Sequence, residues 1–451
     1  MRISTGMIFD AGVSAINRQT GSLLHLQQQV ASGKRMLAPS DDPVAAARAL
    51  EVTQSRDIVA QFKQNHNNAT SALGLEEAQL SSSTDLLARV RELAVQGGNT
   101  SLSNSDRRAI TSELRARFEE LIGIANATDG AGQYLFSGFM GSTKAFGGSV
   151  ESILAGNEIV YSGDDGQRKL QVSPTRFLDV SDSGNDVFVR VSEGNGYFVT
   201  DYARNGSGTG TNNGTGKIDA GSITDPAAWN SRPANSFNIV FSVDNSVVPP
   251  VTYYDIVDTD PASPTFNNSL LTGAPPVLPP TAATGQRVYQ SGQPIILKNQ
   301  GSDPNVFDFG ASVTVDGNPA DGDTFKIAPS SSQSIFATIA KLVGALETAS
   351  AGSSASTAML ANDIGFSLTN LDRAIDNVLR VRAQIGSRLN EIDSLSSVAE
   401  DLNLQYQQTL SQLEDLDYAK AISDLTRKQT DLQAAQQSFV RIAQLSLFNY
   451  L

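Results

Sequence analysis

Apolar residues near the N-terminus recur in alternating steps of three and four, the spacing of a helix that pairs with another helix. The spacing covers about residues 6–31, and Gly33 follows where the helix is expected to end. A single amphipathic helix is marginally stable in water, so this segment is expected to need a helical partner. Its apolar row consists of Phe9, Gly12, Ile16, Gln19, Leu23, Leu26 and Val30.

A much longer helix is predicted next. Ser40, Asp41 and Asp42 offer side-chain oxygens for its N-cap, and Pro43 suits its first turn because a missing N–H costs nothing there. The apolar spacing continues to about Gln96, where two glycines end it. At about 1.5 Å per residue this helix is roughly 80 Å long, which predicts a rod. A third helix follows over about residues 103–129, and Ser103 to Asp106 are expected to form a capping box at its start.

Helical spacing returns at the other end of the chain. A short helix is expected from about residue 333, the longest helix over about 357–413 and a last helix over about 419–448. The outgoing and returning helices are expected to pack antiparallel, with the terminal helices pairing beyond them. The apolar row of the last helix consists of Ile422, Leu425, Gln429, Leu432, Gln436, Phe439, Ala443 and Ser446.

The middle of the chain has a different composition, rich in Gly, Pro, Asn, Asp, Thr and Val. Residues 205–216 are expected to form a flexible loop, and the proline-rich stretch 275–280 a stiff extended piece. Short alternating apolar runs separated by turn residues predict a β-rich region. These runs are 157–161, 187–191, 237–241 and 324–327.

The predicted fold class is therefore α+β, a long antiparallel helical rod formed by the N- and C-terminal segments with an inserted β-rich middle domain. Residues 1–40 and 414–451 are expected to form a terminal helix pair for assembly. Residues 41–140 and 334–413 are expected to form the helical rod domain. Residues 141–333 are expected to form an outer β-rich domain of one or two subdomains.

The chain is strongly acidic, with a net charge of −14 and an isoelectric point of about 4.7. Such a surface repels nucleic acid and anionic lipid, so neither is an expected partner. The chain has no cysteine, which excludes disulfides, thiol catalysis and cysteine metal sites. No apolar stretch approaches the roughly 18 residues of a membrane span. Asp10 and Arg18 interrupt the N-terminus where a Sec signal needs a continuous apolar region.

Candidate catalytic groups are few. His25 and His66 both fall on predicted helices, where a packed or surface side chain is expected rather than a base or a metal ligand. The glycine-rich stretch before Lys217 lacks the spacing of a phosphate-binding loop and its Ser or Thr. Acidic residues in 164–166 and 321–323 are expected to form turns rather than calcium sites. No enzyme, cofactor or metal site is predicted.

The two ends of the chain resemble one protein superfamily. The stretch QQQVASGKRMLAPSDDPVAAARAL resembles the N-terminal signature of the flagellin superfamily, and DLDYAKAISDLTRKQTDLQAAQQSFVRIAQLSLFNYL resembles its C-terminal end. The motifs SGKR and PSDDPVAA, with the opening MRIST, are more similar to hook–filament junction proteins than to filament flagellins. The resemblance covers about residues 1–140 and 334–451 but not the middle.

This resemblance implies a structural component of the bacterial flagellum that joins hook to filament. The terminal helices would form an inner tubular layer, the long helices a rod domain around it, and the β-domain would face outward. Implied partners are neighbouring copies, the other junction protein on the hook side, flagellin on the filament side and an export chaperone before secretion. Export by the flagellar type III apparatus, without a cleaved signal peptide, would place the protein outside the cell. The alternatives are a filament flagellin and an adhesin with a helical stalk.

The residues expected to carry assembly are the large apolar members of the two terminal rows, and their role is packing rather than chemistry. Because Gln19, Gln429 and Gln436 weaken these rows, we hypothesise that the terminal helices are disordered in the free chain and fold when copies pack side by side. The expected assembly residues are Phe9, Ile16, Leu23, Leu26, Val30, Leu425, Leu432 and Phe439.

Amide hydrogen exchange tests this hypothesis. Residues 1–33 and 419–451 should exchange fast in the free chain, because weakly packed helices open readily, and slowly in the assembly. The measurement is exchange followed by mass spectrometry on both states. Equal protection of these segments in the two states would contradict the hypothesis.

Overall fold

A computed structural model describes residues 5–205, 210–232, 235–276, 286–301, 303, 305–349 and 353–447. The chain divides into two compact units. The terminal unit comprises Met1–Asn68, Gln171–Arg176 and Glu391–Leu451, and the central unit comprises Ala69–Leu170 and Phe177–Asn390. Parts of the predicted pieces 205–216 and 275–280, and the side chains of Ala443 and Ser446, lie outside the described residues.

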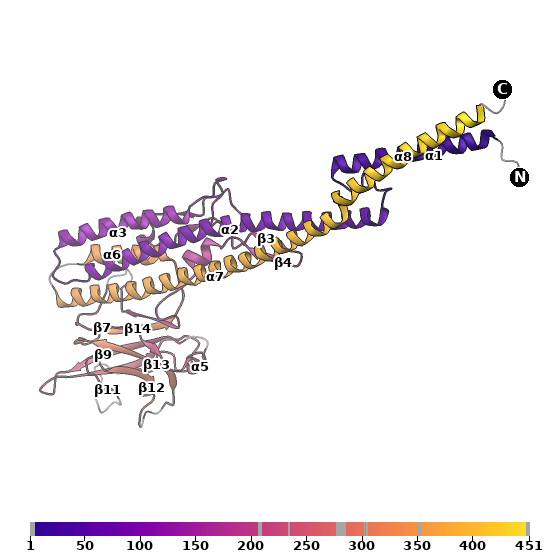
Figure 1. Cartoon of the computed structure of the whole chain (residues 1–451). Coiled ribbons are helices and arrows are strands. Elements are labelled where there is room, and N and C mark those ends of the chain that lie inside the picture. Colours follow the sequence, from indigo (N-terminus) through magenta and orange to yellow (C-terminus); the bar gives the residue numbers. More distant parts are fainter. Residues whose placement is uncertain are drawn as a thin grey trace. The chain divides into compact units, whose positions relative to one another are not determined.

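Six long helices occur where the apolar spacing predicts them (Figure 1). Ser103 and Asp106 form the expected capping box of α3, each side chain accepting the other residue's backbone N–H. Asp42 Oδ1 accepts the Ala45 N–H at 3.0 Å and so caps the first turn of α2. The helices are α1 (Thr5–Ser32), α2 (Pro43–Gly97), α3 (Asn104–Ala125), α6 (Ile335–Thr348), α7 (Ser354–Glu414) and α8 (Tyr418–Leu447).

The outgoing helix α2 and the returning helix α7 carry antiparallel ion pairs. In the central unit Arg382 contacts Glu77 at 2.7 Å and Arg91 contacts Asp372 at 2.7 Å. In the terminal unit Lys63 contacts Glu400 at 2.8 Å. In all three pairs, a later position on α2 is matched by an earlier position on α7. The predicted antiparallel arrangement of the long helices is therefore present in each unit.

A polar residue, Glu76, lies in the apolar row of α2 and is buried in the central unit. Its carboxylate accepts the Asp182 N–H at 3.1 Å, and Arg388 of α7 donates to both carboxylate oxygens of Asp182, at 2.7 and 3.0 Å. Burial raises the pKa of Glu76 well above its usual range, and the charge of Asp182 raises it further. This polar cluster ties both long helices to the segment around residue 182.

Phenylalanine rings fill the helical part of the central unit. Phe336 of α6 meets Phe118 of α3 edge to face at 5.8 Å between ring centroids, and it also contacts Phe146 at 5.3 Å. Phe188 packs edge to face against Phe146 at 5.7 Å. All four rings are fully buried, so this cluster is the core that joins α3 and α6 to the start of the β-rich segment.

The predicted strand at 187–191 is wrong. Residues Asn185–Val189 form a π-helical turn, η1, and only Val191–Ser192 (β5) is extended, pairing with Ser332–Gln333 (β15). The reason is packing: consecutive residues Val187 and Phe188 are both fully buried, whereas a strand would place them on opposite faces. The run at 157–161 likewise yields only a two-residue strand, Val160–Tyr161 (β2), paired with Phe146–Gly147 (β1).

The predicted strands at 237–241 and 324–327 are confirmed, and they pair with each other in an antiparallel five-stranded sheet. Its order is β11 (Arg287–Val288), β10 (Val251–Asp258), β9 (Phe237–Asp244), β14 (Thr324–Pro329) and β6 (Phe198–Tyr202). A second sheet has the order β12 (Pro294–Lys298), β13 (Asp308–Asp316) and β7 (Lys217–Ile218), with β8 (Ser222–Ile223) also on β13. The remaining short elements are the hairpin of β3 (Lys169–Ser173) and β4 (Arg176–Asp179), α4 (Val150–Leu154) and α5 (Pro226–Trp229).

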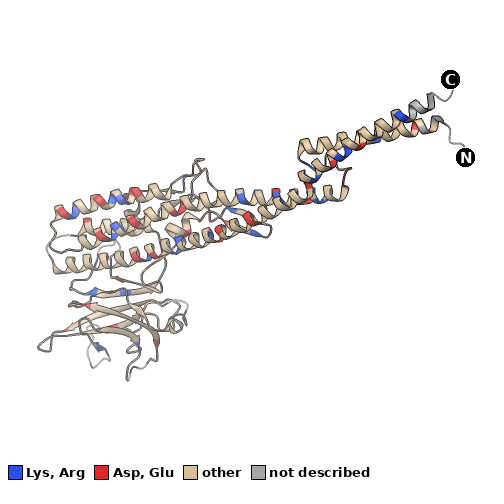
Figure 2. Cartoon of the chain, viewed as in Figure 1, with Lys and Arg blue, Asp and Glu red and all other residues tan. Residues whose placement is uncertain are grey.

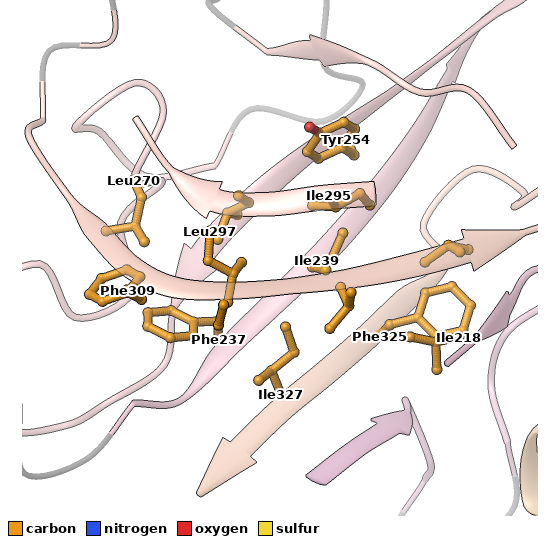
Figure 3. Close-up of a cluster of buried hydrophobic side chains, with 14 of the residues drawn as sticks. Ile218, Phe237, Ile239, Tyr254, Leu270, Ile295, Leu297, Phe309, Phe325 and Ile327 are labelled. Atoms are coloured by element: carbon orange, nitrogen blue, oxygen red, sulfur yellow. The ribbon is translucent and has the colours of Figure 1, made fainter. Parts of the chain in front are cut away.

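The β-rich region has its own apolar core between the two sheets (Figure 3). Phe237, Phe325 and Ile327 contribute from the first sheet, and Leu297 and Phe309 from the second. Side chains of α7 hold this region by its backbone within the central unit. Asn362, for example, accepts the Ile218 N–H at 2.9 Å and donates to Gly216 O at 3.1 Å.

The acidic turns have structural partners. Asp164 Oδ1 accepts the N–H groups of Phe139 and Gly166, and Asp323 accepts those of Asn213 and Gly214. Within the described parts of the chain, no three His, Asp or Glu side chains gather where a metal ion could be held. None of the described helices is long and apolar enough to cross a membrane.

Truncating the central phenylalanine cluster should destabilise the central unit. Phe336→Ala removes a fully buried ring that contacts three others, so we expect a loss of about 3–5 kcal/mol in the free energy of unfolding. Urea unfolding followed by circular dichroism measures it. Phe139→Ala is the matched control, because that ring is 68% exposed, and it should cost below about 1 kcal/mol. Similar losses for both variants would contradict the assignment of the core.

Candidate assembly surface on the terminal helices

Helices α1 and α8 form an antiparallel pair in the terminal unit (Figure 1). At one end of the pair the Phe9 and Phe439 rings contact each other at 4.9 Å between centroids. A Cβ at Gly12 would lie 2.8 Å from the Phe439 ring, so glycine is what lets the helices approach here. At the other end Leu416 N–H donates to Gly33 O at 2.9 Å. Both ends of the chain are therefore held in one register.

At the turn beside this pair, two chain segments that are far apart in sequence are joined by a backbone hydrogen bond and an ion pair. Arg35 N–H donates to Glu414 O at 2.7 Å, and Lys34 Nζ contacts the Glu414 carboxylate at 3.1 Å. Asp41 does not cap α2 as expected but accepts the N–H groups of Leu37 and Ala38. These backbone bonds, from Ala38 and then Leu37, lower the pKa of the Asp41 carboxyl. The motif SGKR–PSDDP thus encodes a folded turn.

Of the predicted assembly residues, Phe9 and Phe439 contact each other across the pair, and none of the predicted set is fully buried. On α1, Phe9 is 51% exposed although its ring touches Phe439. A pair of helices this open buries little apolar surface, which makes further contacts favourable. The half-buried members are Ile16, Leu23, Leu26, Val30, Leu425, Leu432 and Phe439.

The predicted apolar row of α8 needs a correction. Ile422 is 53% exposed, and Gln429 and Gln436 are also exposed. The residues one position earlier, Ala421, Lys428 and Ala435, lie on the inner side, with Ala421 only 4% exposed. The two rows differ by a single residue, and the structure buries the row that contains Ala421 and Ala435 more than the row that contains Ile422, Gln429 and Gln436. The inward alanines were the sequence signal that the predicted row overlooked.

This arrangement leaves an outer row on α8, defined as Ile422, Gln429, Gln436 and Val440. Val440 is 51% exposed, and the neighbouring helix α1 adds the exposed apolar residues Val13 and Leu24. Among described residues α1 carries only Asp10 and Arg18 as charged side chains, whereas α8 carries several of both signs (Figure 2). The face is thus apolar and amide-rich, which suits packing against another helix rather than chemistry.

The two histidines have structural contacts. His66 is buried on α2 and its Nε2 lies 2.7 Å from Val172 O, while His25 Nε2 on α1 lies 3.3 Å from the Asp41 carboxylate. The partner of His66 is a backbone carbonyl and that of His25 is a carboxylate, so neither of these contacts involves a nucleophilic Ser, Thr or Lys side chain. The geometry of the α1–α8 surface therefore suits packing against another helix.

Comparisons with known proteins find relatives of the terminal helices and of the whole chain. Residues 3–140 match the sequence pattern of the bacterial flagellin N-terminal helical region, and residues 368–451 match that of the bacterial flagellin C-terminal helical region. The chain is similar to two proteins named flagellar hook-associated protein 3. The Escherichia coli K12 protein is 24% identical over 448 residues and the Salmonella typhimurium LT2 protein is 22% identical over 448 residues, each covering 99% of both chains.

Solved structures give the same result. The flagellar junction protein FlgL of Legionella pneumophila is 28% identical with a TM-score of 0.66, covering 82% of this chain and 100% of that one. FlgL of Xanthomonas campestris is 28% identical with a TM-score of 0.63, covering 80% of this chain and 99% of that one. By contrast, flagellin A of Vibrio anguillarum is 30% identical over 152 residues, only 33% of this chain and 40% of that protein. From end to end this chain is therefore similar to flagellar hook–filament junction proteins, and it carries the sequence patterns of both terminal helical regions of bacterial flagellin.

Proposed function

We propose that this chain is a structural component that joins the hook to the filament of a bacterial flagellum and that it assembles through its paired terminal helices. The observation that carries the proposal is the extent of the match. Flagellar hook-associated protein 3 matches this chain from end to end, including the middle region, whereas the flagellin compared above matches a third of it. A filament protein is therefore the weaker candidate.

The mechanism we propose is completion of a partly open helix pair by neighbouring copies. The inner residues, from Phe9 to Val30 on α1 and from Leu425 to Phe439 on α8, fix the pair, and all of them stay partly exposed in the single chain. Packing copies side by side would remove this apolar surface from water, at about 25 cal/mol per Å². Assembly thereby stabilises the folded terminal helices.

The proposed partners follow from the position of a junction. One end of the assembly would contact the other junction protein on the hook side, and the opposite end would contact flagellin on the filament side. Before secretion, an export chaperone would cover the C-terminal helices. The exposed Ile422 and Val440 of α8 support this last proposal, because an unassembled chain needs these apolar side chains covered. The proposed route is flagellar type III export without a cleaved signal peptide.

Deleting the gene distinguishes a junction protein from a filament flagellin. A junction protein occupies a short zone, so its loss should leave hooks on the cells and release flagellin monomers into the medium. Loss of a flagellin would instead remove the filament protein itself. Hooks without filaments, together with free flagellin in the medium, would support the proposal, and filaments on deleted cells would contradict it.

A charge placed between α1 and α8 should block filament attachment. Leu432→Asp or Phe439→Asp buries an unpaired carboxylate in the pair, which we expect to cost about 2 kcal/mol or more and to open it. Swimming, and filaments counted by electron microscopy, should fall to near the level of the deletion.

The control for this prediction is Thr430→Asp, an exposed position on the side of α8 that faces away from α1. Circular dichroism should show that the central unit remains folded in all three variants. Normal filaments on Leu432→Asp cells would count against assembly through the helix pair.

A further inference from the structure

The β-rich region is attached to the helices of the central unit through one pair of adjacent strands. The chain enters the region after β5 (Val191–Ser192) and leaves it before β15 (Ser332–Gln333), and these two strands pair antiparallel. We call this pair the neck, and we call the described part of residues 193–331 the outer module. Both covalent connections of the outer module therefore lie side by side, which allows a hinge at the neck.

The outer module has an apolar core of its own (Figure 3). The fully buried members of this core, from Phe198 to Ile327, all belong to the module. Among the described residues of α7, Met359 and Phe366 pack against this core, and both are only partly buried. The phenylalanine cluster that joins α3 and α6 contains no residue of the module. The module and the helices thus have separate cores, so one can move relative to the other without opening either core.

The face that α7 turns towards the outer module is largely polar. Asn370 Oδ1 accepts the Gly194 N–H at 2.8 Å, and Arg373 Nε donates to Gly194 O at 3.2 Å. Polar interfaces of this kind are typical of domains that move relative to one another, because water can replace their hydrogen bonds. The contact residues on α7, at helical spacing, are Met359, Asn362, Asp363, Phe366, Asn370 and Arg373.

An ion pair joins α7 to the outer module at Asp363. The Asp363 carboxylate contacts the Arg204 guanidinium and accepts the Tyr202 hydroxyl at 3.0 Å. Burial, and then the charge of Asp363, raise the pKa of Tyr202, so its hydroxyl keeps its proton for this bond. The side chains of Asp363 and Arg204 are 17% and 32% exposed, which shields this pair from water more than an ordinary surface pair. We call the contact of these three residues the latch.

A cleft of about 650 Å³ lies beside the latch, between the outer module and the helices α4 and α6. Val199 of β6 and Lys326 of β14 line it from the module. Leu154 of α4 and Lys341 of α6 line the opposite side. The module therefore rests on α7 but leaves room on the side of α6, where packed side chains do not block its rotation.

We propose that the outer module is hinged at the neck and that the latch holds it against α7. When the latch opens, the module rotates about the neck and water replaces the polar contacts on α7. Both apolar cores stay intact in this motion, so it requires less free energy than unfolding of either part. The angle between the β-rich module and the helices can then change while the helices keep their packing. This proposal concerns the single chain and is independent of the proposed junction role.

Distances between spin labels test the hinge, and the chain suits this measurement because it contains no cysteine. Ile296→Cys on β12 and Leu379→Cys on α7 place one label on the module and one on the helix, at side chains that are each 43% exposed. Double electron–electron resonance on the purified full chain gives the distribution of distances between the labels. We expect this distribution to be at least about twice as wide as that of either control pair, because the module occupies more than one angle.

The two control pairs each lie within one of the parts. Leu75→Cys with Leu379→Cys reports on the helices, and Tyr197→Cys with Ile296→Cys reports on the module. Leu75 is 42% exposed and Tyr197 is 41% exposed, so all four labelled side chains are matched in exposure. Both control distributions should be narrow, because each part keeps its own core.

Asp363→Ala removes the latch and should change the distances between Ile296→Cys and Leu379→Cys. We expect the ratio of open to closed chains to rise at least about tenfold, because a shielded charge pair has lost one partner. Asp372→Ala is the matched variant, since that carboxylate also lies on α7 but pairs with Arg91 of α2 at 2.7 Å. It should leave the distribution unchanged.

A wide distribution that shifts in Asp363→Ala but not in Asp372→Ala supports the hinge and its latch. A module–helix pair as narrow as the control pairs, in both the parent chain and Asp363→Ala, overturns the hinge. A wide parent distribution that Asp363→Ala leaves unchanged overturns the assignment of the latch. If Asp363→Ala widens the pair within the module equally, Asp363 supports the fold of the module rather than its docking, and the latch is again wrong.

Discussion

The close antiparallel contact of α1 with α8 is the interaction on which both ends of this chain depend. It requires a small residue at Gly12, where a Cβ would lie 2.8 Å from the Phe439 ring, and it leaves Ala421 of α8 buried. Hydrogen bonds between Gly33 and Leu416, and between Arg35 and Glu414, then fix the register where the pair meets the long helices. Two segments separated by nearly the whole chain thereby become one surface.

In the central unit too, an outgoing and a returning helix, α2 and α7, pack antiparallel, but the contacts between them are of a different kind. There the long helices are joined by ion pairs and by the buried Glu76–Asp182–Arg388 cluster, and phenylalanine rings hold α3 and α6. Asparagine side chains of α7 bind backbone groups of the middle region, as Asn377 does with the carbonyls of Asp186 and Val187. Because such hydrogen bonds are made to backbone carbonyls rather than to side chains, they do not require regular secondary structure in the middle region. The helices can therefore hold a middle region of irregular structure.

The terminal unit keeps more of its apolar surface open than a finished core would. The inner residues of the helix pair remain partly exposed, the outer row of α8 faces solvent, and the side chains of Ile58 and Val398 in the groove between α2 and α7 are exposed. Exposed apolar surfaces of this kind mark sites of protein–protein contact, and the proposed assembly would cover them. Open apolar surface is thus the feature on which the proposed assembly rests, in a chain that is similar over its full length to flagellar hook-associated protein 3.

The sequence by itself determined the helices, their antiparallel return and the central strands of the β-rich region, because hydrophobic period and capping residues act locally. On α1 it predicted Phe9, whose ring contacts Phe439 of α8, as part of the assembly surface. It failed where two local patterns were equally acceptable. Val187–Val191 alternates like a strand, but burial of both Val187 and Phe188 makes it a π-helical turn. On α8 the rows beginning at Ala421 and Ile422 differ by one residue, and only packing in the folded chain, which buries Ala421 and leaves Ile422 exposed, selects the first. The groove could not be foreseen either, because it exists only where residues from α2, α7 and the hairpin turn meet in space.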